Sequence, residues 1–310
     1  VELAAGDYYE TITMPSIDNV TLQGSIDSDG LPISRLVPNE GGLDGSAITI
    51  SSPSMTLFIK DLYISGSSTM GGGMLISGTY VSITNCTFEN CTAADGGAVA
   101  FIGGTPYARP MFTECRFLSN AATHGGAIWG GWNHPQGIAT EILLGGCIFD
   151  SNEADSNGGA LSINPSQYSQ YLGFQIFEST FTNNFGLSQA PSIYGVSSYS
   201  TSVYGSNFCG VGEHVDGTYS NDHFNCFTDN CEDADGDNRP DDCDQCSGVE
   251  EDANGNGWAD CAETDNGDGT FIYHVAAGTQ IQSALDVAGD GDVVELAAGD
   301  YYETITMPSI

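Results

Sequence analysis

The chain has 310 residues and carries 41 Asp and Glu against 5 Lys and Arg, a formal net charge of −36 at pH 7. Nucleic acids and anionic lipids are recognised through positive charge, so this balance excludes both as partners and favours the binding of cations. Hydrophobic residues make up 40% of the chain, which is enough for a packed core, and no apolar run approaches the length of a membrane span. We therefore expect a folded, acidic protein with no membrane insertion in this segment.

The chain also contains 10 cysteines without an obvious redox motif. Cysteines in such number favour an oxidising compartment, so we predict an extracellular or cell-surface location. No signal peptide is visible at the start of the sequence, and we expect the segment to come from a longer secreted precursor.

The two ends of the sequence are identical. Residues 1–17 read VELAAGDYYETITMPSI, and residues 294–310 repeat them letter for letter at an offset of 293 residues. This indicates a unit repeated in tandem, or else a segment duplicated by design, and we favour the tandem repeat. The lead-in to the second copy, residues 278–292, has helical apolar spacing and ends at Gly-Asp, which predicts a short capping helix. The segment is then a circular permutation of the natural unit, with a neighbouring copy at each end.

A shorter repeat with fixed landmarks runs through the middle of the chain. An aromatic residue recurs every 25 to 32 positions, at Tyr63, Phe88, Phe117, Phe149, Phe181 and Phe208. Two positions earlier stand Asp61, Cys86, Cys115, Cys147, Ser179 and Ser206. Three positions later stand Cys91, Asn120, Asn152 and Asn184. A glycine pair follows, as in GGAV (96–99), GGAI (125–128) and GGAL (158–161).

This pattern predicts an all-β fold, a parallel β-helix whose coils stack at about 4.8 Å so that equivalent side chains form ladders. Stacked Phe fills the core, stacked Asn satisfies buried backbone groups at the turns, and the glycine pair allows a corner where a Cβ would clash or φ must be positive. We predict the β-helix over 1–224, an acidic Cys-rich segment over 225–268, a cap over 269–293 and the repeat of the start over 294–310.

The F-x-x-N and G-G-A-[ILV] motifs resemble the repeats of the chlamydial polymorphic outer-membrane proteins and, more broadly, the right-handed β-helix, pectate-lyase-like superfamily. The lead-in over 278–292, followed by VELAAGDYYETI and NVTLQG (19–24), resembles the capping start common in that superfamily. The resemblance implies a right-handed β-helix with a short capping helix. It implies nothing firm about activity, because this scaffold carries lyases, hydrolases, adhesins and inert stalks.

Two acidic stretches after residue 226 have the spacing of calcium loops, in which alternate residues point oxygens at a hard cation. The first loop has as predicted ligands Asp233, Asp235, Asp237, Asp241, Asp244 and the carbonyl of Arg239. The second loop has Asp252, Asn254, Asn256, Asp260, Glu263 and the carbonyl of Trp258. DADGDNRPDDCD (233–244) resembles the thrombospondin type 3 calcium repeats, and the competing interpretation is a solvated acidic linker. We predict Ca²⁺ as the cofactor.

Six cysteines accompany these loops and are predicted to form disulfides that stabilise a segment too small for its own core. They are Cys209, Cys226, Cys231, Cys243, Cys246 and Cys261. We expect a Cys209–Cys226 bridge and two bridges among the other four. The alternative is zinc at the C-x-x-C pair of Cys243 and Cys246, but no second such pair or nearby histidine completes a tetrahedral set. Cys86, Cys115 and Cys147 are expected to be free, buried thiols.

The sequence does not favour an enzyme. The cations that a polyuronate lyase needs are scattered, at Arg35, Lys60, Arg109, Arg116 and Arg239. Glu114 and Glu178 occupy equivalent places two coils apart, about 10 Å by the stacking rise, which is the best available pair for a hydrolase. The five histidines share no spacing that suggests a metal site or a catalytic triad.

We therefore predict a structural repeat unit of a secreted or cell-surface filament or rod, whose main partner is a neighbouring copy of itself. Calcium and disulfides would stiffen the junction between tandem β-helix units. The alternative is an adhesin or glycan-binding stalk, in which Trp129 and Trp132 near Tyr107 form an aromatic platform for a sugar. A polysaccharide lyase or hydrolase is the third option.

Overall fold

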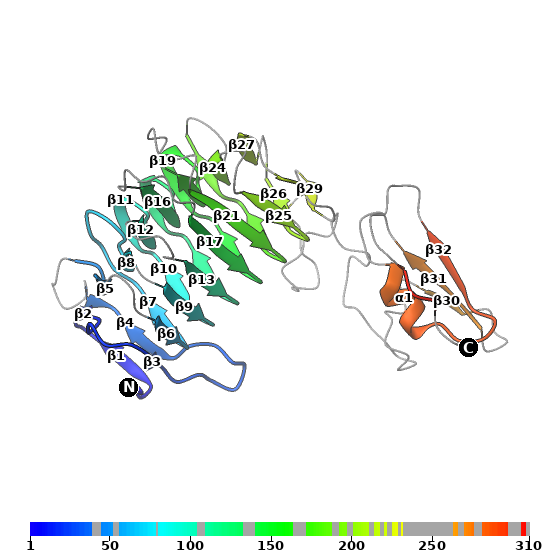
Figure 1. Ribbon diagram of the computed structural model, residues 1–310, viewed down its shortest axis with the longest axis horizontal. Coiled ribbons are helices and arrows are strands. Elements are labelled where there is room, and N and C mark those ends of the chain that lie inside the picture. The colour runs from blue at the N-terminus through cyan, green and yellow to red at the C-terminus, as the bar shows by residue number, and fades with distance from the viewer. Residues whose placement is uncertain are drawn as a thin grey trace.

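The computed structural model describes residues 1–38, 45–51, 56–78, 80–103, 109–132, 140–163, 172–187, 192–196, 201–210, 214–217, 220–221, 225–228, 231, 263–265, 270–275, 281–296 and 305–307. The described chain is nearly all β and forms a parallel β-helix with one short α-helix, as predicted (Figure 1). The coils of the β-helix build four sheets, here named I to IV; the coils pass in turn through sheets I, III and IV, and four of them also contribute a strand to sheet II. Every strand of sheets I to IV pairs in parallel with its equivalent in the next coil.

The strands of sheets I to IV are as follows, over the described residues. Sheet I contains β1 (Gly6–Tyr8), β4 (Ser34–Leu36), β7 (Leu62–Ile64), β10 (Thr87–Glu89), β14 (Arg116–Leu118), β18 (Ile148–Asp150), β22 (Thr180–Thr182), β26 (Asn207–Cys209) and β29 (Cys226–Thr228). Sheet II contains β11 (Thr92–Asp95), β15 (Ala121–His124), β19 (Glu153–Asn157) and β23 (Phe185–Gly186). Sheet III contains β2 (Ile12–Thr13), β5 (Ile48–Ile50), β8 (Met74–Ser77), β12 (Val99–Gly103), β16 (Ile128–Trp132), β20 (Leu161–Ile163), β24 (Ile193–Val196) and β27 (Val215–Gly217). Sheet IV contains β3 (Val20–Gln23), β6 (Thr56–Lys60), β9 (Tyr80–Thr84), β13 (Pro110–Thr113), β17 (Thr140–Gly145), β21 (Leu172–Phe177), β25 (Ser202–Tyr204) and β28 (Ser220–Asn221).

The predicted phenylalanine ladder is confirmed along sheet I. Phe88, Phe117, Phe149, Phe181 and Phe208 are fully buried and pair in register from coil to coil. Their rings stack nearly parallel, with centroids 4.6 to 5.0 Å apart. The spacing is close to the rise per coil, so the same side chain repeats at the same position and fills the core without a gap.

The prediction that Tyr63 begins this ladder is wrong. Phe88 lies beside Ile64, which is fully buried, while Tyr63 points outward and stacks on Arg35. The same shift of one residue places Leu62 in the core and moves Asp61 to the turn, instead of the core position predicted for it. The prediction assumed an aromatic residue at this position in every coil, whereas the core accepts any apolar side chain there, here Ile64.

In the coils from β10 to β20, three turns each contain one residue in the left-handed region, and the same turn uses the same position in successive coils. Between sheets IV and I these residues are Asp61, Asn85, Glu114, Gly146, Glu178 and Gly205. Between sheets I and II they are Asn90, Ser119, Ser151 and Asn183. Between sheets II and III they are Gly96, Gly125 and Gly158, the first glycines of the predicted glycine pairs, and Gly71 takes the equivalent place before β8.

The second glycine of each pair is needed for a different reason. A Cβ on Gly126 would lie 2.1 Å from the carbonyl oxygen of Gly159 in the next coil, and a Cβ on Gly97 would lie 2.1 Å from that of Gly126. The coils therefore approach so closely at this corner that only glycine fits. Both reasons expected for the glycine pair, a positive φ and a clash of the Cβ, are confirmed at adjacent positions.

The C-terminal part is a small sheet covered by the helix. Strand β31 (Phe271–Val275) pairs antiparallel with β30 (Glu263–Asp265) and parallel with β32 (Val293–Leu296). Helix α1 (Ile281–Val287) connects β31 to β32, where a short helix was predicted. The helix and strands share their own core, separate from that of the β-helix, which is made by Tyr273, Val275, Ile281, Ala284 and Leu285.

Candidate functional site

A ladder of asparagine side chains lies inside the β-helix at the turn after sheet I. Asn120, Asn152 and Asn184 are buried, and each side-chain amide bridges two coils. The Oδ1 of Asn152 accepts from the backbone N–H and the Nδ2 of Asn120 at 3.1 and 2.9 Å. Its Nδ2 donates to the carbonyl of Phe117 at 2.9 Å and to the Oδ1 of Asn184 at 2.9 Å. The predicted ladder is therefore confirmed, and it ties successive coils together along the axis.

Cys91 takes the asparagine position one coil earlier, where its backbone N–H donates to the Oδ1 of Asn120 at 3.0 Å. Its thiol is fully buried and close to the carbonyl of Ile64. Burial raises the pKa of the Cys91 thiol to about 12, because the thiolate would lose its hydration inside the core. Such a thiol is a packing group and not a nucleophile.

A second interior ladder occupies the turn before sheet I. Cys86, Cys115 and Cys147 are buried free thiols, as predicted, and Ser179 and Ser206 continue the column. The backbone N–H of Cys147 donates to the hydroxyl of Ser179 at 3.1 Å, and that of Ser179 donates to Ser206 at 3.1 Å. Burial raises the pKa values of Cys115 and Cys147 well above the ordinary thiol value. These cysteines hold the turn by weak hydrogen bonds and are unsuited to catalysis.

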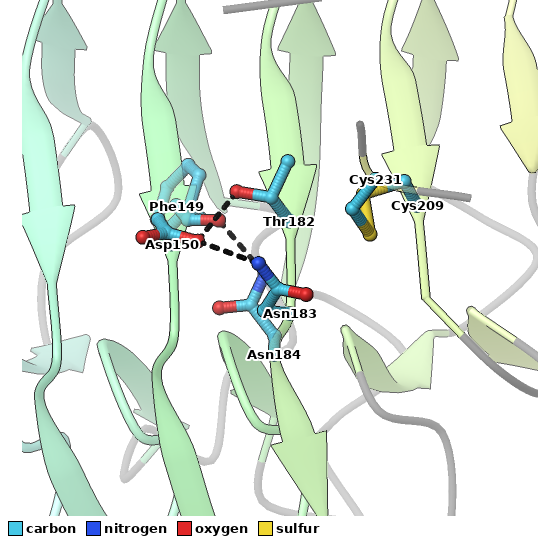
Figure 2. The surroundings of a disulfide bond; sticks show 7 residues. All are labelled: Phe149, Asp150, Thr182, Asn183, Asn184, Cys209 and Cys231. Carbon is cyan, nitrogen blue, oxygen red and sulfur yellow. Dashed lines mark hydrogen bonds between the residues drawn. A yellow bond between two sulfur atoms is a disulfide. The ribbon is translucent and has the colours of Figure 1, made fainter. Parts of the chain in front are cut away.

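Strand β26, the last but one in sheet I, carries a disulfide. Cys209, on β26, is bonded to Cys231, with their Cα atoms 5.3 Å apart. Figure 2 shows this bridge beside inter-coil hydrogen bonds, from Asn184 to the Phe149 carbonyl at 2.8 Å and from Thr182 and Asn183 to Asp150 at 2.7 and 3.3 Å. The disulfide thus fixes the chain that leaves the β-helix to a strand that is part of the hydrogen-bonded stack.

The predicted Cys209–Cys226 bridge is wrong. Sheet register places Cys226 beside Asn207 and Thr228 beside Cys209, so Cys226 is displaced along the strand direction from Cys209. Disulfides need Cα atoms within about 7 Å and Cβ vectors that converge, which this offset does not offer. Cys226 is disulfide-bonded, to a cysteine other than Cys209. The other predicted disulfide cysteines, Cys243, Cys246 and Cys261, lie outside the described residues.

The two predicted calcium loops fall almost entirely outside the described residues. Of the predicted ligands only Glu263 is described, as the first residue of β30, and nothing is described of its side chain. Among the described residues, no group of three or more His, Cys, Asp or Glu is placed to hold a metal. Calcium therefore stays a prediction for 233–244 and 252–263.

The carboxylates considered for hydrolysis lie on the surface at turns. Glu114 and Glu178 occupy the left-handed position between sheets IV and I, with Gly146 between them in the stack, and both are exposed. The γ-carbons of Glu114 and Glu178 lie over the missing Cβ positions of Gly146 and Gly205, 3.8 and 3.7 Å away. A Cβ would therefore fit at both glycines, and the positive φ of about 60° is what favours glycine at these turns.

Of the two tryptophans considered as a sugar platform, only Trp129 has a described side chain. Its exposed fraction is 8%, and its ring lies flat over the strand, so that a Cβ on Gly131 would come within 2.1 Å of it. A stacking platform needs an exposed ring face, and Trp129 offers little of one. The side chain of Trp132 and all of Tyr107 lie outside the described residues.

One cluster escaped the sequence analysis because its members are far apart in the chain. On the outer face of sheet I, Asp7, Arg35 and Tyr63 lie in successive coils. Arg35 pairs with Asp7 at 3.2 Å and lies 4.5 Å from the ring centre of Tyr63. Burial and a hydrogen bond with Glu89 raise the pKa of Tyr63. Only the coil register reveals this cluster, since neither spacing nor residue type marks it in the sequence.

Comparisons with known proteins add no identity. No family model, no curated protein and no solved structure matches the chain. No helix in the described parts of the chain has the length and hydropathy to cross a membrane. The class that the fold defines is therefore a parallel β-helix protein, and its role has to be argued from the chain itself.

Proposed function

We propose that the chain is a structural repeat unit of a secreted or cell-surface filament or rod, assembled from neighbouring copies of itself. The observation that carries this proposal is the identity of residues 1–17 and 294–310, at the two ends of a chain that contains a β-helix. A β-helix is open at its two ends, where strands still present hydrogen-bonding edges that another unit can fill. Strands β1 and β2, together with residues 1–3 beside β3, form one such end over the described residues.

The interior of the β-helix suits a load-bearing role. Its core is a column of stacked rings and aliphatic side chains, and its turns are tied by asparagine, cysteine and serine ladders that run along the axis. The buried thiols and exposed carboxylates do not form a catalytic arrangement within the described residues. The glycan-binding alternative depended on an exposed tryptophan platform, and the burial of Trp129 removes half of that support.

Calcium and disulfides would stiffen the connection between units. The segment with calcium-loop spacing stands between the last described coil and the C-terminal sheet, and the Cys209–Cys231 bridge ties its beginning to the β-helix. A net charge of −36 makes clustered carboxylates repel one another unless cations neutralise them. Removal of calcium should therefore loosen this segment and shorten or bend the rods.

Electron microscopy of the native, unfractionated material in calcium buffer tests the proposal. The nine strands of sheet I, at about 4.8 Å each, predict about 43 Å of β-helix per unit, so the axial repeat should exceed this by the length of the connecting segment. Filaments with one such repeat per 293-residue unit would support the structural role. Discrete particles that do not associate in calcium would contradict it.

Chelation is the second test. The native material in excess EGTA should lose straight rods and gain protease sensitivity in the segment 232–262, with readdition of calcium restoring both. Magnesium at the same concentration is the control, because it demands a stricter octahedral geometry than these loops offer. Unchanged stiffness and protease resistance in EGTA would remove calcium from the proposal.

A further inference from the structure

The repeated segment stands in two different environments, and the two are complementary. In the first copy it begins the β-helix, with coils after it and none before it among the described residues. In the second copy it follows helix α1 and begins within β32 of the C-terminal sheet, with no coil after it among the described residues. The first copy therefore shows the contacts of the segment with the unit that follows it, and the second copy shows its contacts with the unit that precedes it.

In the first copy, the start of the segment binds the edge of sheet IV. The N-terminal nitrogen of Val1 donates to the carbonyl of Thr21 at 2.7 Å, and Leu3 N–H donates to the carbonyl of Gln23 at 2.8 Å. Gln23 N–H donates to the carbonyl of Val1 at 2.9 Å. These bonds make residues 1–3 a parallel neighbour of β3. The bonded groups belong to Val1 and Leu3, so Glu2 turns its backbone groups to the opposite edge.

In the second copy, the same three residues pair with a different strand. Residues 294–296 are part of β32, which lies parallel to β31 with Glu295 beside His274. The side chain of Val294 packs against the core under α1, whereas its counterpart Val1 is 77% exposed. Conversely, Leu3 packs against the core of the β-helix, whereas its counterpart Leu296 is 44% exposed. Each copy thus buries the apolar side chain that the other copy leaves exposed.

A second strand of the segment shows the same division. In the first copy Ile12 and Met14 donate to the carbonyls of Ala47 and Thr49 at 2.8 and 2.9 Å, on the β5 side. Alternation turns the backbone of Thr13 to the other edge. In the second copy its counterpart Thr306 is bound on that edge by the side chain of Gln282 in α1. The Thr306 N–H donates to the Oε1 of Gln282 at 2.7 Å, and the Nε2 of Gln282 donates to the Thr306 carbonyl at 3.1 Å.

The apolar side chains beside Thr306 point to the same conclusion. Met307 is 71% exposed, whereas its counterpart Met14 is 6% exposed in the core of the β-helix. Ile305 is 45% exposed, whereas its counterpart Ile12 packs against that core. A following set of coils would bury both residues at the places where the first copy already buries them.

We propose that, in a chain carrying the unit in tandem, one copy of the segment makes both sets of contacts at once. Residues 294–296 are then a central strand, flanked by β31 of one unit and by the β3 counterpart of the next. Helix α1 closes the first coil of the next unit through Gln282. The partner is thus a second copy of this chain, and the boundary is a hydrogen-bonded sheet and not a flexible linker. The inference rests on the proposed role of the chain as a repeat unit.

Strand order supports this arrangement. Val294 and Leu296 are two residues apart, so their side chains point to the same face of the strand, and the cores under α1 and in the β-helix lie on that face. The connections from β31 to β32 and from residues 1–3 to β3 both join parallel strands over this face. Such connections are almost always right-handed, so each step moves in the same direction and places β31 and β3 on opposite edges.

The test compares the 310-residue chain with a two-unit chain, in which residues 1–293 are followed by residues 1–310. In both chains, hydrogen exchange at residues 294–307 is followed by mass spectrometry; in the two-unit chain these residues form the boundary between the units. The amides of Leu296, Ile305 and Met307 should exchange at least roughly tenfold more slowly in the two-unit chain, since each gains a backbone acceptor. Equal exchange in the two chains would overturn the inference.

A substitution gives an independent readout. Met307→Asp should leave the thermal midpoint of the 310-residue chain unchanged, because the side chain is exposed there. In the two-unit chain the same substitution at the boundary should abolish the exchange protection of Leu296. Glu295→Gln is the matched control, because Glu295 and its counterpart Glu2 are both exposed, and it should leave protection intact. Protection that survives Met307→Asp would also overturn the inference.

The two proposals fail in different ways. Native filaments whose boundary amides exchange freely would keep the rod and replace the sheet joint with a linker. If the boundary amides were protected but the material never formed filaments, the sheet between units would be supported and the proposed structural role would be contradicted.

Discussion

The asparagine ladder predicts a large and specific loss of stability for Asn152→Ala. The substitution leaves two buried backbone groups without their present partners, the N–H of Asn120 and the carbonyl of Phe117. A buried polar group left unsatisfied costs about 1–3 kcal/mol, so the expected loss is about 4 kcal/mol in the free energy of unfolding. For a β-helix of this size that corresponds to a fall of about 10 °C in the thermal midpoint.

The assay is urea unfolding followed by far-ultraviolet circular dichroism, together with a thermal scan. The control is Asn183→Ser, which changes an exposed asparagine one residue before the ladder. Ser119 and Ser151 already occupy the equivalent left-handed positions in the neighbouring coils, so serine fits there and the change should be within about 0.5 kcal/mol. If Asn152→Ala cost no more than this control, the amides would not be holding the coils, and the ladder argument would be refuted.

Three further predictions follow from single contacts. The pKa of Cys91 in the folded chain is raised to about 12 from an ordinary value of 9.0, so the stability that the buried thiol contributes should be full below about pH 9 and fall as the pH rises toward 12. Urea unfolding at a series of pH values should show a smaller fall for Cys91→Ala. Loss of the Cys209–Cys231 bridge, which closes 22 residues, in a Cys209→Ala, Cys231→Ala variant should cost about 3 kcal/mol, with reduction of the native protein as the comparison. Gly126→Ala should cost several kcal/mol or prevent folding, because its Cβ would meet the Gly159 carbonyl, whereas Gly289→Ala, with its nearest contact at 3.6 Å, should change the thermal midpoint by no more than a few degrees.

The sequence allowed the fold to be predicted where one position requires the same residue type in three successive coils. Asparagine is the side chain that both donates and accepts across neighbouring coils, and glycine is the residue that tolerates the corner. These positions kept their letters, and the structure confirms them at Asn120, Asn152 and Gly126. The core position is less demanding, since any apolar side chain fills it. The ladder was therefore missed at Ile64, where Tyr63 offered a misleading aromatic letter one residue away.

Disulfide pairing depends on register, which spacing alone does not provide. Cys226 is the next cysteine in the sequence after Cys209. The sheet nevertheless places Cys226 beside Asn207, and Cys209 bonds to Cys231. The Arg35 cluster was missed for the same reason, because its members meet only when coils of unequal length are aligned. Contacts between coils become predictable once the core positions of each coil are fixed correctly.

From β10 to β22 the coils differ in length mainly at one connection, whereas the first coils also carry long connections at 24–33, between β3 and β4, and at 37–47, between β4 and β5. The connection from sheet I to sheet II is two residues long at 119–120, 151–152 and 183–184, and its left-handed residue and ladder residue recur each time. One additional residue enters sheet II as a register shift opposite Ala122–His124. By contrast, the connection from sheet III to sheet IV grows from two residues after β8 to eight after β20. Between β10 and β22, insertions are thus tolerated along one edge of the β-helix, while the turns that carry the asparagine and cysteine ladders keep a length of two residues.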